Sequence, residues 1–138
     1  MDESVKPFKW PVRVYYENTD AGGVVYYANY LAFMERARTE WLRELGFENQ
    51  QLMDEQQVVF AVRRACVDYL RPARLDDELV VVAEISAVKR ASLVFRQQIL
   101  RGEETLCEGE IVLACVDTTS FRPAPIPTAI KDRIDHVR

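Results

Sequence analysis

The sequence predicts an α+β fold in which one long helix packs against a mainly antiparallel sheet of five strands. Only the segment from about residue 28 to residue 45 has an extended helical spacing of apolar residues, whereas the segments on either side alternate as strands do. An 18-residue helix is about 27 Å long and a ten-residue strand about 33 Å, so the sheet can wrap the helix lengthwise.

The first predicted strand covers residues 12–16, where β-branched and aromatic residues follow Pro11. Gly22 and Gly23 end this pattern. The helix then repeats apolar residues at intervals of four and three, and Gly46 is a suitable stop. The repeating positions are Tyr30, Met34, Ala37, Trp41 and Leu45.

Four further strands are predicted after residue 57, and we expect them to form an antiparallel meander. Turn residues separate them, including Asp76-Asp77 and Gly102. Their predicted ranges are 58–69, 78–88, about 93–99 and 105 to about 116. Prolines at 123, 125 and 127 end the regular structure, and residues 128–137 predict a short helix that begins after Pro127.

The 138 residues suit a single domain, with a core at about residues 7–127. A single helix covers only one face of such a sheet, so the remaining apolar surface predicts self-association. Eighteen basic and twenty-two acidic residues give a net charge of −4, which argues against a general nucleic-acid binder.

We expect a cytoplasmic protein without a transmembrane segment. No apolar run approaches the roughly 20 residues that span a bilayer, and residues 1–7 lack the apolar core of a signal peptide. The three cysteines, Cys66, Cys107 and Cys115, are far apart and are interpreted as structural thiols, with Cys107 and Cys115 buried on one face of the last strand.

The chemistry of the chain is predicted to lie in residues 15–30, where an apolar strand, a turn and a helix start follow one another. The turn contains a single acid, Asp20, and the two glycines permit close approach of a ligand to the backbone. The start of a helix carries unpaired N–H groups and partial positive charge, which stabilise a developing oxyanion. A carboxylate beside an oxyanion site indicates acyl transfer or hydrolysis. The alternative is an ordinary turn or N-cap aspartate.

Four separate motifs resemble the hotdog-fold acyl-CoA thioesterases, in the same order along the chain. They are Val12-Arg13-Val14-Tyr15-Tyr16, the loop at residues 19–26, residues 35–42 and residues 71–77. The similarity runs from about Pro7 to Pro127 and is greatest to the Tol–Pal-associated (YbgC-like) thioesterases, which are related to 4-hydroxybenzoyl-CoA thioesterases.

The resemblance implies a hotdog fold, dimers formed by joining sheets, pairing of dimers into homotetramers, and active sites at subunit interfaces. It implies an acyl-CoA thioester substrate hydrolysed to free acid and CoA, with no cofactor or metal. Asp20 matches the catalytic carboxylate of the family, either as a base that activates water or as a nucleophile that forms an anhydride. Tyr16 matches a tyrosine close to the site, with an ordinary strand aromatic as the alternative.

Tyr27 departs from the YbgC-like pattern, in which a histidine commonly stands between a tyrosine and an alanine. The hydroxybenzoyl relatives resemble this chain in carrying tyrosine there, and their backbone N–H at the helix start polarises the thioester carbonyl. We therefore assign that role to the Tyr27 N–H, against a purely packing aromatic. The missing histidine also leaves a second hypothesis: an acyl-CoA or acyl-carrier-protein binding module of the Tol–Pal or phospholipid system with little hydrolysis.

The basic turn Lys89-Arg90-Ala91-Ser92 resembles a feature that binds coenzyme A phosphates in relatives. Lys89 and Arg90 would form the charge-assisted contacts and Ser92 a further hydrogen bond, although a solvated hairpin is the alternative. Glu35 and Arg38 match the helix motif of the family but equally suit ion pairs.

Other catalytic classes lack their motifs in this sequence. There is no Gly-x-Ser-x-Gly elbow, no phosphate-binding loop and no dinucleotide fingerprint. A single histidine, His136, and three scattered cysteines disfavour a zinc enzyme, and the position of that histidine disfavours a hotdog dehydratase.

Overall fold

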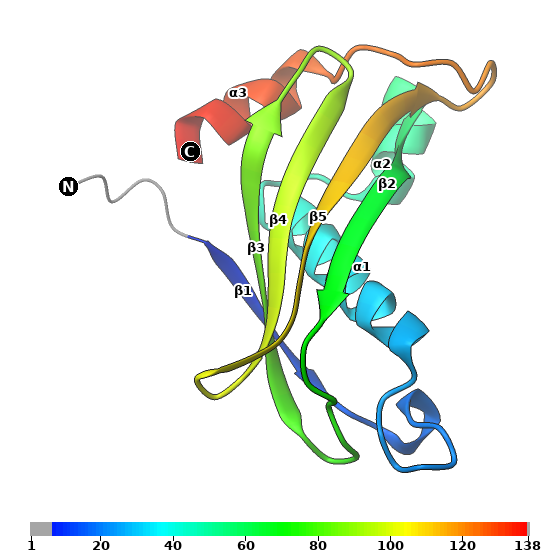
Figure 1. Ribbon diagram of the computed structural model, residues 1–138. Helices are drawn as coiled ribbons and strands as arrows, with labels where there is room; N and C mark the ends of the chain where they lie inside the picture. Colours follow the sequence, from blue (N-terminus) through cyan, green and yellow to red (C-terminus); the bar gives the residue numbers. More distant parts are fainter. Residues whose placement is uncertain (1–6, 138) are drawn as a thin grey trace.

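A computed structural model describes residues 7–137 and confirms the α+β prediction. A five-stranded antiparallel sheet curves around helix α1 (Tyr27–Glu44) in the order β1-β3-β4-β5-β2 (Figure 1). The strands are β1 (Phe8–Arg13), β2 (Val58–Tyr69), β3 (Glu78–Val88), β4 (Ser92–Arg101) and β5 (Glu104–Asp117). The shorter elements are a 3-10 turn at Tyr16–Asn18, α2 (Asn49–Gln51), a π-helical turn at Leu52–Gln56, and α3 (Thr128–Val137).

The predicted bounds agree with the structure for α1, α3 and the four later strands to within a few residues, but the first strand is wrong. It begins at Phe8 and ends at Arg13, so Tyr15 and Tyr16 lie outside it. Pro11 is tolerated inside β1 because β1 is an edge strand. The strand does not continue because the Asn18 side chain accepts the Tyr15 N–H at 2.8 Å and begins a 3-10 turn.

The predicted meander is also only partly right. Strands β3, β4 and β5 form consecutive hairpins, but β2 pairs with β5 and lies at the far edge of the sheet. After β2 the Leu70 N–H donates to the Leu106 carbonyl. The chain then crosses toward the opposite edge of the sheet, where β3 lies between β1 and β4. This crossover leaves β2 free along its outer side.

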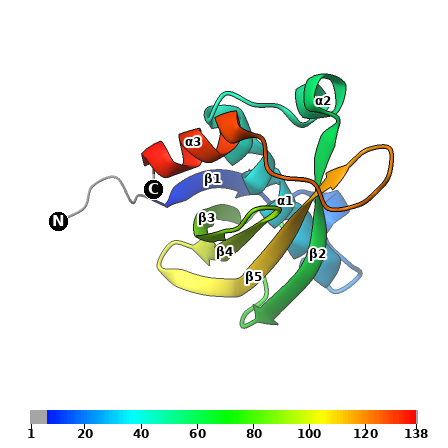
Figure 2. The same ribbon diagram turned by 90° about the horizontal axis from the view of Figure 1, so that it is seen from above.

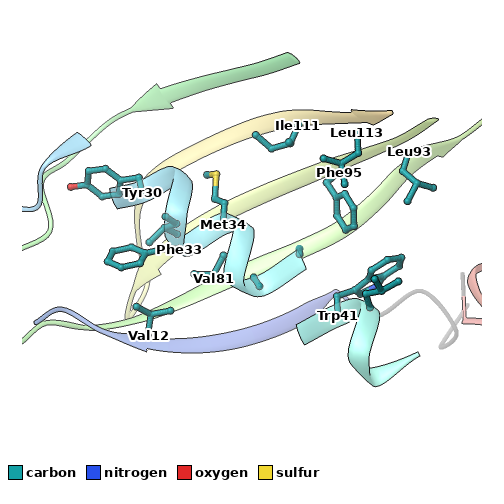
Figure 3. Close-up of a cluster of buried hydrophobic side chains, with 14 of the residues drawn as sticks. Val12, Tyr30, Phe33, Met34, Trp41, Val81, Leu93, Phe95, Ile111 and Leu113 are labelled. Carbon is teal, nitrogen blue, oxygen red and sulfur yellow. The ribbon is translucent and has the colours of Figure 1, made fainter. Parts of the chain in front are cut away.

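The core lies between α1 and the concave face of the sheet. Phe33, Met34 and Ala37 of α1 are fully buried, and the Trp41 ring meets the Phe95 ring edge-on with centroids 5.0 Å apart (Figure 3). Helix α3 adds Ile130 and Ile134, both completely buried, and in the view from above it lies beside β1, on the same side of the sheet as α1 (Figure 2). No helix within residues 7–137 is both long and apolar enough to span a bilayer.

One polar network crosses this core and was not predicted. Gln97, on the inner face of β4, is buried; its amide donates to the Met34 carbonyl at 3.0 Å and its oxygen accepts from Arg38 at 2.9 Å. Burial lowers the pKa of the Arg38 guanidinium, while Glu35 opposes that shift. Both Gln97 amide atoms are thereby satisfied, so Arg38 has a structural role that the helix motif alone did not reveal.

The cysteine interpretation is confirmed for the two residues of β5. Cys107 and Cys115 are completely buried, and burial raises the pKa of Cys107 to about 12 and of Cys115 to about 11. Thiols with such values carry almost no thiolate at neutral pH and are poor nucleophiles. Cys66 is exposed on β2 instead.

Candidate active site

The loop between the 3-10 turn and α1 folds as a small hairpin with Asp20 at its tip. The Tyr26 N–H donates to the Asn18 carbonyl at 3.0 Å, and the Asp20 N–H donates to the Val24 carbonyl at 2.9 Å. Gly23 has a φ of +79°, which explains why glycine is needed there. At Gly22 an added Cβ would lie 3.3 Å from the Asp20 Oδ1 atom, so its small size leaves room for the carboxylate.

The Asp20 carboxylate is exposed and only partly engaged. Its Oδ1 atom accepts the Gly22 N–H at 2.8 Å, and Oδ2 has no hydrogen-bond partner among residues 7–137. The turn interpretation of Asp20 is therefore correct for one oxygen, but the N-cap interpretation is wrong because Tyr26 occupies the N-cap of α1. One fixed oxygen and one free oxygen suit a base or a nucleophile.

Helix α1 presents free donors beside this hairpin. No side chain caps its first turn, and within the described part of the chain the Tyr27 N–H has no acceptor. Because the N-terminus of an 18-residue helix is partially positive, this N–H is suited to an oxygen that gains negative charge.

Two asparagines hold the hairpin against the helix, and sequence reasoning missed both. The Asn18 amide donates to the Asn29 Oδ1 atom at 3.1 Å, and the Asn29 amide donates back to the Asn18 carbonyl at 3.3 Å. Asn18 is buried. A short polar residue just before a turn and another in the first helical turn are the only sequence signals that could have indicated this brace.

Aromatic rings surround the helix start. Tyr27 lies between Tyr26 and Tyr69, with centroid distances of 4.8 Å and 6.2 Å, and Tyr30 lies 5.4 Å from Tyr69. A hydrogen bond with Tyr27 raises the pKa of Tyr26, and burial raises the pKa of Tyr30 and Tyr69. These three phenols therefore stay neutral at physiological pH and do not compete with Asp20 as bases.

Tyr16 lies on the outer side of the loop, with 81% of its surface exposed. It lines a shallow depression together with Tyr15, Leu75 and Asp76. Among the described residues its side chain makes no hydrogen bond to Asp20, so a role for Tyr16 near the site stays a prediction.

An ion pair stabilises the segment on which the hairpin rests. Val25 and Val24 pair with Ala73 and Arg74, and Asp77 closes the following turn. Burial favours the neutral form of the Asp77 carboxyl, but the Arg101 guanidinium at 2.7 Å and the Arg74 N–H at 2.8 Å outweigh it and lower its pKa.

We expect Asp77→Asn to lower the free energy of unfolding by about 1–2 kcal/mol at pH 7, since a partly buried charged hydrogen bond is lost. A carboxyl with a lowered folded-state pKa stabilises the fold above its unfolded pKa of about 4, and this contribution disappears as the pH falls through the folded value. Urea unfolding between pH 3 and pH 7 should therefore show the two proteins converging at acid pH. Asp76→Asn, at a neighbouring residue with a φ of 71° that asparagine tolerates, is the control; equal stability of Asp77→Asn and the wild type at pH 7 would contradict the prediction.

The predicted coenzyme A turn lies at the other end of the molecule. Lys89 and Arg90 are exposed at the β3–β4 turn, whereas the hairpin that carries Asp20 lies beyond the opposite end of β3 (Figure 1), where its Val24 pairs with Arg74. The eleven residues of β3 separate the two ends by about 36 Å. Ser92 is buried at the start of β4. One chain therefore brings Asp20, Gly22, Gly23 and Tyr27 together but not Lys89, Arg90 or Ser92.

An apolar cavity against α1 is not lined by Asp20 or its hairpin. It has a volume of about 120 Å³ and lies between the second half of α1 and the inner faces of β2, β4 and β5. Arg38, Leu42, Phe60, Leu93 and Phe95 are among its lining residues. Phe60 and Val62, in the first half of β2, line this cavity, whereas the start of α1 next to the Asp20 hairpin contacts the last residue of β2 through the Tyr27 and Tyr69 rings.

Comparisons with known proteins identify the family of the chain. Residues 22–108 match the thioesterase superfamily. The chain is 47% identical over 131 residues to the acyl-CoA thioesterase YbgC of Haemophilus influenzae, covering 95% of this chain and 96% of that protein. It is 53% identical over 124 residues to the acyl-CoA thioester hydrolase YbgC of Escherichia coli, covering 89% and 92% of the two chains.

The solved structures that resemble the chain include a probable thioesterase from Bartonella henselae. That structure is 34% identical, has a TM-score of 0.85, and is matched over 88% of this chain and 100% of its own. The fold is therefore the hotdog fold that the sequence motifs implied. The chain belongs to the thioesterase superfamily, alongside the YbgC-like acyl-CoA thioesterases, and is a thioester hydrolase.

Proposed function

We propose that this protein hydrolyses acyl-CoA thioesters to a free acid and coenzyme A, with Asp20 as the catalytic carboxylate. The observation that carries the proposal is the rigid unit formed by the hairpin and α1. It holds a half-free carboxylate and an uncapped helix N-terminus on one exposed surface through the Asn18–Asn29 brace.

In the proposed mechanism the thioester oxygen accepts a hydrogen bond from the Tyr27 N–H, which polarises the carbonyl. Asp20 then either takes a proton from an attacking water or attacks the carbonyl carbon itself. In the first route the tetrahedral intermediate expels the thiolate of coenzyme A, which takes up the proton. In the second, the thiolate leaves first and water cleaves the resulting anhydride. Both routes consume one water and need Asp20 ionised.

The test of the activity is the release of free thiol from short, long and aromatic acyl-CoAs. We expect release from at least one of them, and the fastest substrate would identify the acyl class. Tight binding of acyl-CoA or of an acyl carrier protein without any turnover would instead support the binding-module hypothesis, which the absence of the family histidine motivates. Tyr27→His would then be the next variant to measure.

We further propose that the working unit is a homo-oligomer built on a dimer joined at β2, and that this dimer can pair into a tetramer. Strand β2 is twelve residues long, lies at an edge of the sheet and is exposed at every residue from Ala61 to Cys66. A long open edge of this kind is usually protected, and a second copy can protect it by strand pairing. Light scattering after size-exclusion chromatography would separate monomer, dimer and tetramer.

This dimer would bring the separated parts of the site together. Two copies of one strand related by a two-fold axis perpendicular to the sheet run antiparallel, so the end of one molecule that carries Lys89 meets the end of the other that carries Asp20. The basic turn of one copy would then bind the coenzyme A phosphates while Asp20 of the other acts on the thioester.

We also expect the protein to be cytoplasmic, which cell fractionation would check.

The basic turn gives a prediction of its own. We expect the double variant Lys89→Glu and Arg90→Glu to raise the KM for acyl-CoA at least tenfold with little change in kcat, because two charge-assisted phosphate contacts become repulsive. An acyl-pantetheine substrate, which lacks the nucleotide, should show no such change. An unchanged KM for acyl-CoA would refute this placement of the nucleotide.

A further inference from the structure

The loop after β5 holds an aromatic residue in a strained conformation. Phe121 has a φ of 59°, in the left-handed region that costs about 1–2 kcal/mol for a residue with a side chain. Hydrogen bonds support this loop: the Asp117 Oδ1 atom accepts the Thr119 and Ser120 N–H groups, both at 2.8 Å, and the Phe121 N–H donates to the Asp117 carbonyl at 2.9 Å. Strain that is maintained in this way is characteristic of functional loops.

The Phe121 side chain packs little against the described part of its own chain, since 78% of its surface is exposed. The loop is attached to the beginning of β2, where the Thr118 N–H donates to the Gln57 carbonyl at 3.0 Å. Seen from above, residues 118–122 project past β2, away from the rest of the sheet (Figure 2).

A second exposed apolar surface lies at the other end of β2. Tyr69, the last residue of β2, and Leu70, which follows it, have about half of their surfaces exposed, and the Tyr69 ring contacts the ring of Tyr27 at the start of α1. This surface borders the hairpin that carries Asp20, because Tyr26 and Tyr27 join the hairpin to the helix.

We propose that Phe121 acts in trans: it packs on the Tyr27 and Tyr69 rings of the second copy and forms one wall of that copy's active site. The inference rests on the proposed function and on the β2 dimer. In an antiparallel pair with full overlap, Val58 of one copy lies opposite Tyr69 of the other. The loop beside Gln57 then reaches the helix start of the partner. Because the contact is isologous, it forms twice in each dimer.

Phe121 is a positioning residue in this arrangement. An aromatic wall over Tyr27 would shield the polarised carbonyl oxygen from bulk solvent, while leaving the carbonyl carbon open to the attacking water, and would hold the acyl-thioester segment against Asp20. The positive φ at Phe121 also matters for this role, because an ordinary negative φ at this residue would turn the backbone of the loop in a different direction and carry the ring away from the partner.

The first variant to test is Phe121→Asn, since asparagine adopts the left-handed conformation readily and the fold is retained without the ring. We expect kcat/KM to fall about tenfold, the scale of one aromatic contact. Thr119→Ala, in the same loop, keeps the backbone N–H that Asp117 binds and should behave as the wild type. Wild-type kcat/KM for Phe121→Asn would overturn the inference.

The decisive experiment mixes subunits of Phe121→Asn and Asp20→Asn in equal amounts and lets them exchange. If Phe121 acts in trans, about a quarter of all sites combine an intact Asp20 with an intact Phe121 from the neighbouring subunit, and the mixture regains about a quarter of the wild-type activity with the wild-type KM. If Phe121 acts within its own chain, no such site forms and the mixture shows only the residual activity of Phe121→Asn. That result would overturn the inference.

Two further results separate this inference from the proposals on which it rests. Thiol release by the wild type that is lost in Asp20→Asn establishes the function, whatever the mixture does. A defect of Phe121→Asn that disappears at high protein concentration would mean that the ring only stabilises the dimer, and this too would overturn its role in the site.

Discussion

Replacing Asp20 with asparagine should reduce kcat by about 100- to 10,000-fold, the range expected for removal of a catalytic base or nucleophile. The side chain keeps its size and an oxygen, so it still accepts the Gly22 N–H that shapes the turn. The second position becomes an amide that neither attacks a carbonyl nor takes a proton from water. The expected result is a folded protein that binds acyl-CoA and releases almost no thiol.

The measurement is the steady-state rate of thiol release on the best acyl-CoA, accompanied by thermal unfolding of each protein. Asp76→Asn is the matched control, because it makes the same chemical change at an exposed aspartate on the neighbouring turn. An Asp20→Asn protein that turns over at the wild-type rate would remove Asp20 from the mechanism. The unfolding curves show whether an inactive Asp20→Asn protein is still folded, and so distinguish loss of the carboxylate from loss of the fold.

Replacing Tyr27 with proline should lower kcat by about 100- to 1000-fold, the effect of removing one oxyanion donor. Proline deletes the backbone N–H, and the first position of a helix is where proline is best tolerated. The preceding residue also permits it: Tyr26 has φ −63° and ψ 134°, the extended conformation that a following proline requires. The variant therefore removes the donor without breaking α1.

Tyr27→Ala separates the N–H from the aromatic ring. It loses the same ring contacts to Tyr26 and Tyr69 as the proline variant but keeps the donor. The ratio of kcat between the alanine and proline variants therefore measures the N–H alone. A ratio near one, with both proteins folded by circular dichroism, would mean that the carbonyl is polarised by some other group.

The proposed mechanism does not need the histidine that YbgC-like sequences commonly carry at the position of Tyr27. The Tyr27 phenol contacts other tyrosines, and the described part of the chain has only His136, in the terminal helix. An aspartate-dependent rate that is independent of any histidine should therefore show no activity transition near pH 6.5, where imidazole titrates. The pH dependence of kcat can be measured with the same thiol-release assay that is used for the two variants above.

The sequence by itself determined most of the helices and strands and pointed to the loop that carries the candidate site. Spacings of three and four identify α1, and alternation identifies β2 to β5, because both periods follow from local backbone geometry. Asp20, Gly22, Gly23 and Tyr27 are contiguous in the chain, so a local reading also finds most of the candidate site. The bounds of the first strand were predicted wrongly for two reasons that a local pattern does not contain. Pro11 is accepted inside β1 because β1 is an edge strand, and the hydrogen bond from the Tyr15 N–H to the Asn18 side chain ends the extended segment.

Only the tertiary structure decided how distant segments meet. Four features depend on which strands pair: the place of β2 beside β5, the separation of Lys89 from Asp20, the Gln97–Arg38 network, and the course of the loop between β5 and α3 past β2. Pairing between strands is set by the sum of many contacts between residues far apart in the chain, and no local period encodes that sum. For the same reason the free edge of β2, on which the proposed trans arrangement of the active site depends, became visible only once the sheet was assembled.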